Sequence, residues 1–224
     1  MDIKELKIKK TEDGSATLFV PELNEHYHSY KGAVRESLHV FIQAGLEELS
    51  RARKNIRILE IGFGTGLNAL LTLDYTYSDP ELKVHYTTLE KYPLDLNLII
   101  QLNYTVHSNN TIRELFSDIH QAPWNLVSEI TDRFSILKLE ADLTQEIDLE
   151  NCDLVYFDAF APEKQPEMWD EAIFETIYGA MNKGGILVTY CAKGEVRRRM
   201  QRAGFNVERL PGPPGKREML RARK

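Results

Sequence analysis

The stretch Ile58-Leu59-Glu60-Ile61-Gly62-Phe63-Gly64-Thr65-Gly66 predicts how this chain folds. The apolar run at residues 57–61 predicts a buried strand, and a helical pattern follows at residues 66–75. The three glycines between them allow a tight turn and a close approach of the backbone to a ligand. A strand, a glycine loop and a helix in this order are typical of the ligand-binding turn of an open α/β sheet.

Further strands and helices alternate downstream of the glycine loop. Apolar runs predict strands at residues 84–89, 136–139, 154–157, 186–190, 206–210 and 218–221, and helical spacing predicts helices at 168–181 and 195–203. Pro93 suits the first turn of another helix, and Lys183-Gly184-Gly185 is a helix-stop signal. The alternation predicts an α/β fold with a doubly wound, mostly parallel sheet. The last two strands, which no helix separates, are expected to pair antiparallel at one edge.

The amino-terminal segment lies outside this alternation. Residues 3–8 and 16–20 alternate around a turn-rich cluster and predict a short hairpin, and residues 34–50 have apolar positions at helical spacing. We therefore expect residues 1–50 to form a hairpin and a helix that pack on a domain of residues 51–224. Residues 93–133 are too long for a simple crossover, so the sequence predicts a helical insertion there.

Composition and cysteine content are those of an ordinary globular protein. The chain has 224 residues, of which 42% are hydrophobic and 28% charged. Cys152 and Cys191 lie in apolar runs and are expected to be buried thiols, and no histidine pairs with them at zinc-site spacing. The amino terminus is charged and no long uncharged apolar stretch occurs, so we expect a cytoplasmic protein without a membrane span or a metal.

Charge is distributed unevenly along the sequence. The formal net charge is −6, but residues 191–224 contain eleven basic and three acidic residues, a net +8, which leaves −14 for the rest. A basic end on an acidic body is one form of phosphate-binding surface. The alternative is a solvated helix face followed by a charged tail.

Acidic residues follow or end four of the predicted strands. Glu60 precedes the glycine loop, Glu90 ends the next strand, and Asp142 and Asp158 follow two later strands. Each acid by itself is better explained as a helix N-cap or a surface charge. Together they predict an adenosyl ligand, with Glu90 accepting the ribose hydroxyls, Asp142 near the adenine amino group and Asp158 beside a reactive methyl group.

The type of adenosyl ligand follows from two details of the loop. A dinucleotide fingerprint has Gly or Ala where this chain has Leu67. The carboxylate two residues before Gly62 is more typical of S-adenosylmethionine sites, where it lies near the cationic methionyl group. The sequence therefore favours S-adenosylmethionine and disfavours a nicotinamide oxidoreductase.

The string Asp158-Ala159-Phe160-Ala161-Pro162-x-Lys164-x-Pro166-x-Met168-Trp169 is longer and less common than a glycine loop. It resembles the signature of bacterial tRNA 5-methylaminomethyl-2-thiouridine methyltransferases. The likeness extends to Gly62-Phe63-Gly64-Thr65-Gly66-Leu67-Asn68, to Lys216-Arg217-Glu218-Met219-Leu220, and upstream to Ser29, Glu36 and Val40-Phe41. Gln165 and Glu167 depart from it, because Asn and Asp are frequent there in the family.

The resemblance implies a class I methyltransferase fold, which is Rossmann-like. It also implies S-adenosylmethionine-dependent N-methylation of the aminomethyl group on wobble 5-aminomethyl-2-thiouridine, with a tRNA anticodon loop as partner. Many family members are fused to an FAD-dependent oxidase that makes the amine. This sequence has no second glycine fingerprint, so it resembles the stand-alone form, which needs a separate amine-generating enzyme.

The same resemblance, joined to the strand-end acids, gives a set of expected site residues. Asp158 is expected to orient the amine and to relay its proton, although an ordinary Asp pKa of about 3.9 is low for a base unless burial raises it. Phe160 is expected to stack on a base; Trp169 either does the same or simply packs. The cofactor set is Glu60, Gly62, Gly64, Gly66, Asn68, Glu90 and Asp142, and the substrate set is Ser29, Glu36, Phe160, Lys164, Arg197, Arg198, Lys216 and Arg217, with Lys193 as a further phosphate contact.

Two other functions remain compatible with the sequence. One is a small-molecule amine methyltransferase or an aminopropyl transferase of the same fold, which gives no reason for the basic carboxyl end. The other is a non-catalytic RNA-binding protein that keeps the fold as a relic, against which the intact set of acids argues. Methyl transfer to tRNA separates the first from the proposed activity, and cofactor binding separates the second.

Overall fold

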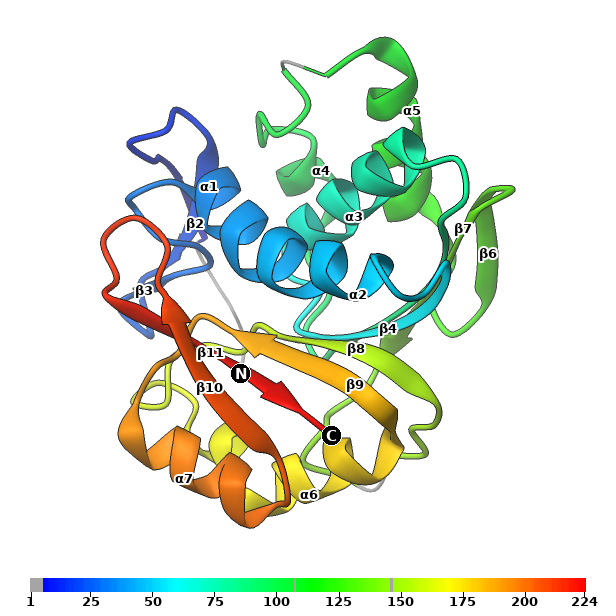
Figure 1. Ribbon diagram of the computed structural model, residues 1–224. Coiled ribbons are helices and arrows are strands. Elements are labelled where there is room, and N and C mark those ends of the chain that lie inside the picture. The colour runs from blue at the N-terminus through cyan, green and yellow to red at the C-terminus, as the bar shows by residue number, and fades with distance from the viewer. Residues whose placement is uncertain (1–5, 107, 146) are drawn as a thin grey trace.

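The computed structural model describes residues 6–106, 108–145 and 147–224, and its centre is an eight-stranded sheet (Figure 1). Its order is β10-β11-β9-β8-β4-β5-β7-β6. The strands are β4 (Asn55–Ile61), β5 (Lys83–Glu90), β6 (Val127–Thr131), β7 (Phe134–Glu140), β8 (Cys152–Phe157), β9 (Met181–Thr189), β10 (Asn206–Pro211) and β11 (Glu218–Arg223). The five central strands are parallel, which confirms the predicted doubly wound α/β fold.

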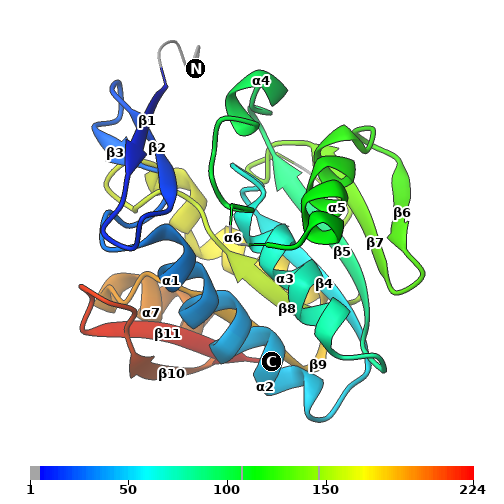
Figure 2. The ribbon, with the colours of Figure 1, turned by 90° about the horizontal axis from the view of Figure 1, so that it is seen from above.

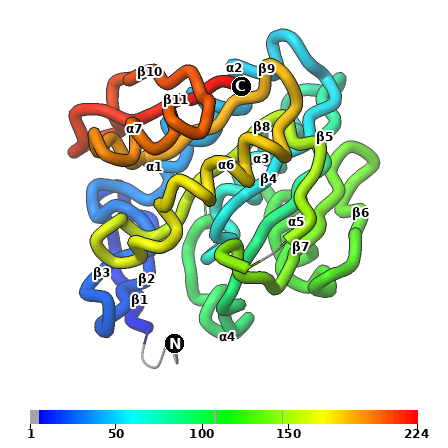
Figure 3. The backbone as a smooth tube through the Cα atoms, turned by 90° about the horizontal axis from the view of Figure 1, so that it is seen from below, coloured from blue at the N-terminus to red at the C-terminus, as the bar shows by residue number. Residues whose placement is uncertain are grey.

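Helices cover both faces of this sheet (Figures 1 and 3). One face is covered by α1 (Ala33–Ser37), the π-helical segment η1 (Leu38–Glu47), α2 (Glu48–Ser50), α3 (Leu67–Ser78), α4 (Leu96–Ile99) and α5 (Asn110–Gln121). The other is covered by the 3₁₀ turn η2 (Pro166–Trp169), α6 (Glu171–Ala180) and α7 (Gly194–Arg202). Side chains alternate between the two faces of β4, so Ile56 and Ile58 join one apolar cluster while Leu59 and Ile61 join the other.

The amino-terminal segment forms a separate three-stranded sheet beside the main one (Figure 2). Its strands are β1 (Lys7–Lys10), β2 (Ala16–Val20) and β3 (Glu25–His26), and β1 pairs antiparallel with β2 as predicted. Residues 1–5, part of the expected first strand, lie outside the described residues. Asn103 accepts a hydrogen bond from the Ala16 amide and donates one to the Gly14 carbonyl, which joins this sheet to the segment after α4.

Several details differ from the sequence prediction. Residues 93–133 contain α4 and α5 and also β6, whose five residues include only two apolar ones, Val127 and Ile130, at a spacing that does not predict a strand. Pro93 precedes its helix, because Asp95 is the N-cap of α4 and accepts from the Asn97 amide. The Lys183-Gly184-Gly185 signal lies inside β9, since α6 already ends at Ala180.

The carboxyl-terminal pairing follows the prediction. β10 pairs antiparallel with β11, and β11 pairs antiparallel with β9, so β10 is the outermost strand. Cys152 and Cys191 are free and buried, which confirms them as packed thiols. Within the described part of the chain, no helix combines the length and the apolar character needed to cross a bilayer.

Candidate active site

A cavity of about 510 Å³ opens at the carboxyl ends of β4, β5 and β8. The chain leaves β4 toward β5 and β7 on one side and returns through β8 and β9 on the other, so this is the switch point where open α/β sheets bind ligands. Ten of the residues expected at the site line this cavity: Ser29, Glu36, Gly62, Gly64, Asn68, Glu90, Asp142, Asp158, Phe160 and Lys216. The topology has therefore brought together residues that lie up to 187 positions apart, from Ser29 to Lys216.

The glycine loop has a backbone that other residues rarely adopt. Gly62, Gly64 and Gly66 have φ angles of 91°, 51° and 72°. A Cβ atom on Gly62 would lie 3.0 Å from the Asp158 carbonyl oxygen, and one on Gly64 would lie 3.1 Å from the Tyr27 ring. The loop thus forms a cradle that side chains would fill, as required where a ligand must approach the backbone.

Glu90 ends β5 and holds this loop in place. One carboxyl oxygen accepts a hydrogen bond from the Gly64 amide and the other from the Tyr92 amide, each at 2.9 Å. Burial raises the pKa of Glu90 against the effect of these bonds. Each carboxyl oxygen has two lone pairs, so both can still accept a hydroxyl of a ribose.

Asp142 lies across the cavity from the loop, after β7. Its carboxylate is 2.6 Å from the Lys91 ammonium and accepts two hydrogen bonds from Thr144, at 2.9 Å from the amide and 2.7 Å from the hydroxyl. Burial opposes ionisation, but the bonds from Lys91 and Thr144 outweigh it and hold the pKa of Asp142 below its ordinary value. A charged Asp142 is a suitable acceptor for an exocyclic amino group.

Asp158 follows β8 and is half-buried at the centre of the cavity. Burial raises the pKa of this carboxyl to about 7, and the nearby charge of Glu36 acts in the same direction. The Asn68 side-chain amide donates to Asp158 Oδ2 at 2.9 Å, which partly opposes the shift. This environment supplies what the sequence lacked, a carboxylate able to take a proton near neutral pH.

Glu36 and Lys216 form an ion pair on the other side of Asp158. The Lys216 ammonium is 2.7 Å from Glu36 Oε1 and lies 3.8 Å from the centre of the Tyr190 ring. The Ser29 amide donates to the second Glu36 oxygen at 2.7 Å. A negative charge, a positive charge and an aromatic face are therefore arranged beside the candidate base.

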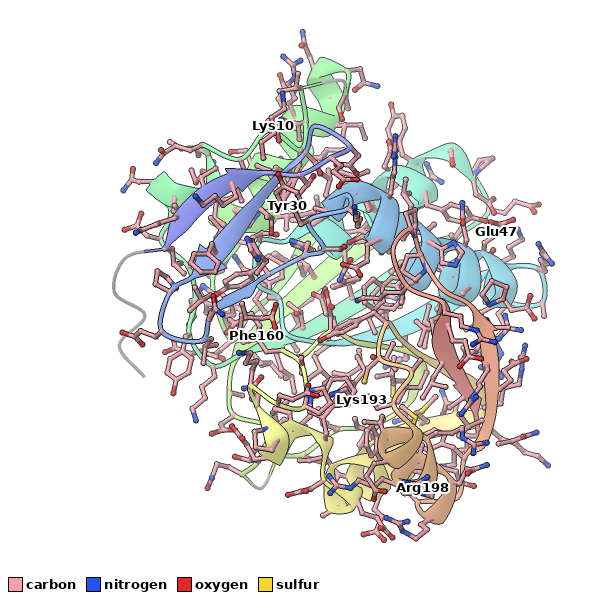
Figure 4. All side chains as sticks on the ribbon, turned by 90° about the vertical axis from the view of Figure 1, so that its left-hand side faces the viewer. Lys10, Tyr30, Glu47, Phe160, Lys193 and Arg198 are labelled. Atoms are coloured by element: carbon pink, nitrogen blue, oxygen red, sulfur yellow. The ribbon has the colours of Figure 1, made fainter. Side chains whose placement is uncertain are left out.

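Aromatic side chains close the same end of the cavity. The Phe160 and Tyr27 rings pack edge to face with their centres 5.1 Å apart, and Figure 4 shows Phe160 between the amino-terminal segment and α7. Trp169 is fully buried and its indole N–H donates to the Phe160 carbonyl at 2.8 Å. Trp169 is thus a packing residue that fixes the Phe160 backbone, which settles the choice between stacking and packing.

Seven expected residues are not among those that line the cavity: Glu60, Gly66, Lys164, Lys193, Arg197, Arg198 and Arg217. Gly66 is the N-cap of α3, immediately behind the loop. Glu60 is fully buried on the α3 face of β4 and is not among the residues that line the cavity, so its contact with the cofactor stays a prediction. The period of two along a strand accounts for this position, because Glu60 and Ile61 point to opposite faces.

The basic carboxyl end is largely neutralised by partners. Lys193 pairs with Glu163, and further ion pairs join Arg198 to Glu195, Arg199 to Asp170, Arg202 to Glu171, Arg209 to Glu218, Arg221 to Glu208, and Arg223 to Glu48. In the described part of the chain, Lys164, Arg197 and Arg217 have no carboxylate partner. The positive surface available to a polyanion is therefore smaller than the composition suggests.

Sequence reasoning missed Tyr27, Lys91 and Tyr190, which also line the cavity. Tyr190 directly follows β9, so the same strand-end rule that selected Asp158 would have found it. Lys91 follows Glu90 at the end of β5 and was available by that rule as well. Tyr27 follows β3 of the separate small sheet, and no local pattern places that segment over the glycine loop.

Comparison with known proteins finds similarity to one family. A family model described as S-adenosyl-L-methionine-dependent methyltransferase matches residues 128–224. The tRNA 5-methylaminomethyl-2-thiouridine biosynthesis bifunctional protein MnmC of Cupriavidus metallidurans is 33% identical over 221 residues, which cover 92% of this chain and 32% of that protein. The chain thus spans about a third of the length of the curated relatives it matches.

Solved structures agree with the sequence relatives. MnmC2 from Aquifex aeolicus superposes with a TM-score of 0.81 at 29% identity, over 99% of this chain and 71% of that one. Spermidine synthase from Thermotoga maritima superposes with a TM-score of 0.53 at 12% identity, over all of this chain and 74% of that one, a likeness of fold alone.

Fold, glycine cradle and family model together define a class I S-adenosylmethionine-dependent methyltransferase. Within that class, the chain matches the methyltransferase part of the MnmC proteins, which confirms the resemblance found in the Asp158–Trp169 string.

Proposed function

We propose that this chain transfers a methyl group from S-adenosylmethionine to the primary amine of 5-aminomethyl-2-thiouridine at the wobble position of tRNA. One observation supports this most strongly. The similarity to MnmC covers 92% of this chain. Within the chain, Glu90, Asp142, Asp158 and Phe160 all line one cavity. Cofactor and nucleobase can therefore meet at Asp158.

The cofactor supplies a methyl group on a sulfonium centre, and the residues of the chain provide position and proton transfer. Glu90 and the glycine loop hold the adenosyl part, and Asp142 accepts from its amino group. Asp158 accepts the proton that the ammonium must lose to become a nucleophile, and its pKa of about 7 suits this exchange near neutral pH. Holding the amine in line with the methyl group removes much of the entropic barrier.

The nucleobase end of the site follows from the aromatic residues. Phe160 and Tyr27 offer ring surfaces against which a base removed from its stack can pack. An anticodon-loop base is single-stranded, so its extrusion costs little. The reaction needs a primary amine on that base, which a separate activity must make first.

Glu90→Gln is expected to weaken binding of S-adenosylhomocysteine about tenfold or more. The amide group of Gln would turn an N–H₂ toward one of the two backbone amides that Glu90 now accepts from. Losing a hydrogen bond to a charged group costs about 1.5–3 kcal/mol. Isothermal titration calorimetry measures the affinity, with Glu140→Gln, an exposed residue at the end of the adjacent strand, as the matched control. Equal affinity in the two variants would contradict the role of Glu90.

Neutralising Arg197 and Arg217 together, both to Gln, is expected to weaken tRNA binding and to reduce its salt slope by about two. These side chains have no carboxylate partner among the described residues, so their charge is available to phosphates. The matched control is Arg198→Gln with Arg202→Gln, because both of these arginines are already paired. Filter binding across a salt series measures the effect, and an equal slope in both double variants rules out this phosphate contact.

The activity itself is tested by methyl transfer from labelled S-adenosylmethionine to tRNA that contains the aminomethyl nucleoside. We expect labelled methyl groups in the acid-insoluble tRNA, and we expect nuclease treatment to remove this label from the acid-insoluble fraction. Transfer to small amines such as putrescine, with none to tRNA, would favour the small-molecule alternative that shares the spermidine synthase fold. A chain that does not bind the cofactor at all would be a relic.

A further inference from the structure

One face of the small amino-terminal sheet carries a row of basic and aromatic side chains. The strand registers place Lys7 of β1 beside Phe19 of β2, and Phe19 beside His26 of β3. Directly paired residues of antiparallel strands share a face, so these three side chains form one row across the sheet. The Phe19 and His26 ring centres are 4.8 Å apart, and the Tyr30 ring centre lies 6.4 Å from that of His26. Tyr30 thus extends the row beyond β3.

This row begins at the rim of the active-site cavity. His26 and Tyr30 both line the cavity, and Tyr30 is nevertheless 56% exposed. Tyr27, which follows His26, packs edge to face against Phe160, and Figure 4 shows Tyr30 and Phe160 on the same side of the molecule. β1 lies two strand spacings from β3, or about 10 Å. The row therefore leads from the place proposed for the nucleobase onto the outer surface.

The positive charges of the row are not neutralised by neighbouring acids. Lys7 and Lys9 are exposed, and they share a face because they are two residues apart in β1. Among the residues that the structure describes, neither ammonium group has a carboxylate partner. Glu25, the acid next to His26, is paired with Val20 and so belongs to the other face. The carboxyl-terminal segment differs, because most of its basic side chains are in ion pairs.

β1 is the outer strand of its sheet, and lysines on an edge strand also discourage pairing with another chain. That role explains the charges but not the aromatic rings beside them. Phe19 is only half-buried on the face of the lysines, and Tyr30 is largely exposed. Rings on which bases stack, combined with basic side chains that follow the phosphates, are the means by which proteins bind single-stranded nucleic acid.

We propose that the amino-terminal platform, defined as Lys7, Lys9, Phe19, His26 and Tyr30, binds the single-stranded RNA next to the base that enters the cavity. The Tyr30 ring stacks on a neighbouring base, and the two ammonium groups contact phosphates. This inference rests on the proposed function, because it takes tRNA as the substrate. An anticodon loop fits the platform, since its unpaired bases are available for stacking. Bound there, the neighbouring nucleotide keeps the target base in the cavity.

Replacing both lysines of the platform by glutamine tests the phosphate contacts. Lys7→Gln with Lys9→Gln is expected to weaken binding of a fluorescent anticodon stem–loop about tenfold at low salt and to reduce the salt slope by about 1.4. Lys7→Arg with Lys9→Arg should retain both. The matched control is Lys83→Gln with Lys183→Gln, because these exposed lysines lie near the starts of β5 and β9, away from the cavity. Fluorescence anisotropy across a salt series measures both quantities, and equal effects in the two glutamine pairs would overturn the proposal.

Tyr30→Leu tests the stacking contact separately from the charge. It should weaken binding of the same RNA about fivefold or more, the loss expected for one stacked base, and leave the salt slope unchanged. Tyr30→Phe, which keeps the ring, should bind normally. Tyr77→Leu is the matched control, since Tyr77 is 51% exposed on α3 and does not line the cavity. Equal affinities of Tyr30→Leu and Tyr77→Leu would contradict the stacking contact.

Two further ligands show which kind of site the variants lose. Lys7→Gln with Lys9→Gln should bind S-adenosylhomocysteine normally, because both lysines lie outside the cavity. The unmodified chain should bind poly-glutamate far more weakly than RNA, since an acidic peptide has no bases to stack. Equal affinity for the two polyanions would favour an acidic protein partner and overturn the proposal. An unmodified chain that binds no RNA would overturn it as well.

RNA binding and methyl transfer are measured separately, so the platform and the proposed function can fail independently. In the labelled-cofactor assay, the glutamine pair in β1 should raise the KM for tRNA about tenfold and change kcat less than about twofold. If RNA binding depends on the platform but the chain methylates no tRNA, the proposed function fails and the platform stands. If the unmodified chain methylates tRNA and the platform variants match their controls, the platform fails and the proposed function stands.

Discussion

Asp158→Asn is expected to lower the rate of methyl transfer by about two to four orders of magnitude, the range for loss of a general base. The Asn side chain is nearly isosteric and keeps an oxygen for the Asn68 amide, which now donates to Asp158 Oδ2 at 2.9 Å. It cannot accept the proton of the substrate ammonium. Single-turnover transfer from labelled cofactor measures the rate, and S-adenosylhomocysteine affinity should change only a few fold.

Because the pKa of Asp158 is raised, we expect two further effects of pH. In the folded chain the pKa of Asp158 is raised from its ordinary value to about 7, so the charged form destabilises the fold increasingly as pH rises from about 4 to 7. Asp158→Asn should therefore be at least as stable as the unmodified chain at pH 7, and loss of activity cannot be attributed to unfolding. Activity of the unmodified chain should rise with pH through about 7, as Asp158 becomes a base.

Asp132→Asn is the matched control for this experiment. Its side chain is 86% exposed, and its nearest ion-pair partner, Arg133, is 3.8 Å away. The change should leave the rate unaffected. If the Asp158→Asn variant transfers methyl groups at a rate within threefold of the control, proton acceptance at this position contributes little to the reaction.

Gly62→Ala is expected to abolish most cofactor binding and to destabilise the fold by about 1–3 kcal/mol. Gly62 has a φ of 91°, and a Cβ there would lie 3.0 Å from the Asp158 carbonyl oxygen. The loop must shift to relieve both strains. Because the Gly62 amide donates to Leu89 at the end of β5, a shift would also disturb the adjacent Glu90. Thermal unfolding and calorimetry with S-adenosylhomocysteine measure the two effects.

Gly179→Ala is the matched control, because replacing this glycine by alanine is expected to stabilise the fold. Gly179 is in α6, away from the cavity, and a Cβ there would meet nothing within 4 Å. Alanine is the better helix former by about 0.5–1 kcal/mol, so this variant should be slightly more stable and bind the cofactor normally. If Gly62→Ala behaves like Gly179→Ala, the glycine loop is not the cradle described above.

Much of the fold was predictable because buried parallel strands have a strong local pattern. β4 and β8 are mostly apolar and buried on both faces, and both were located to within a few residues. β5 is only partly buried on one face, and β9 begins at Met181, five residues before its predicted start, because its first residues are polar or glycine. β6 lies at the sheet edge, and its two apolar residues, Val127 and Ile130, are not spaced as an alternating strand requires. Its short polar sequence resembles that of a loop.

The site residues that follow the ends of strands were predictable. The ion pairs between residues far apart in the sequence were not. Glu90 and Asp158 end or follow parallel strands, and the topology alone brings them to one edge. The pair of Glu36 with Lys216 joins residues 180 positions apart, and no local pattern contains it. The same holds for the basic carboxyl end, whose charges are paired with acids such as Glu48 and Asp170 from other elements.

Glu60 was placed at the cofactor by its distance from Gly62, and the structure buries it beside the cavity. Its neighbours Leu59 and Ile61 belong to one apolar cluster, so Glu60 belongs to the opposite face. The period of two was available in the sequence and would have predicted which face of the sheet Glu60 occupies.

The central claim, methylation of an aminomethyl group on tRNA, is tested most directly by nucleoside analysis of tRNA from cells that lack this protein. We expect 5-aminomethyl-2-thiouridine to accumulate and its methylated product to disappear. The intact gene should restore the product, and an Asp158→Asn copy should not. A nucleoside profile that is unchanged by loss of the protein would contradict the account.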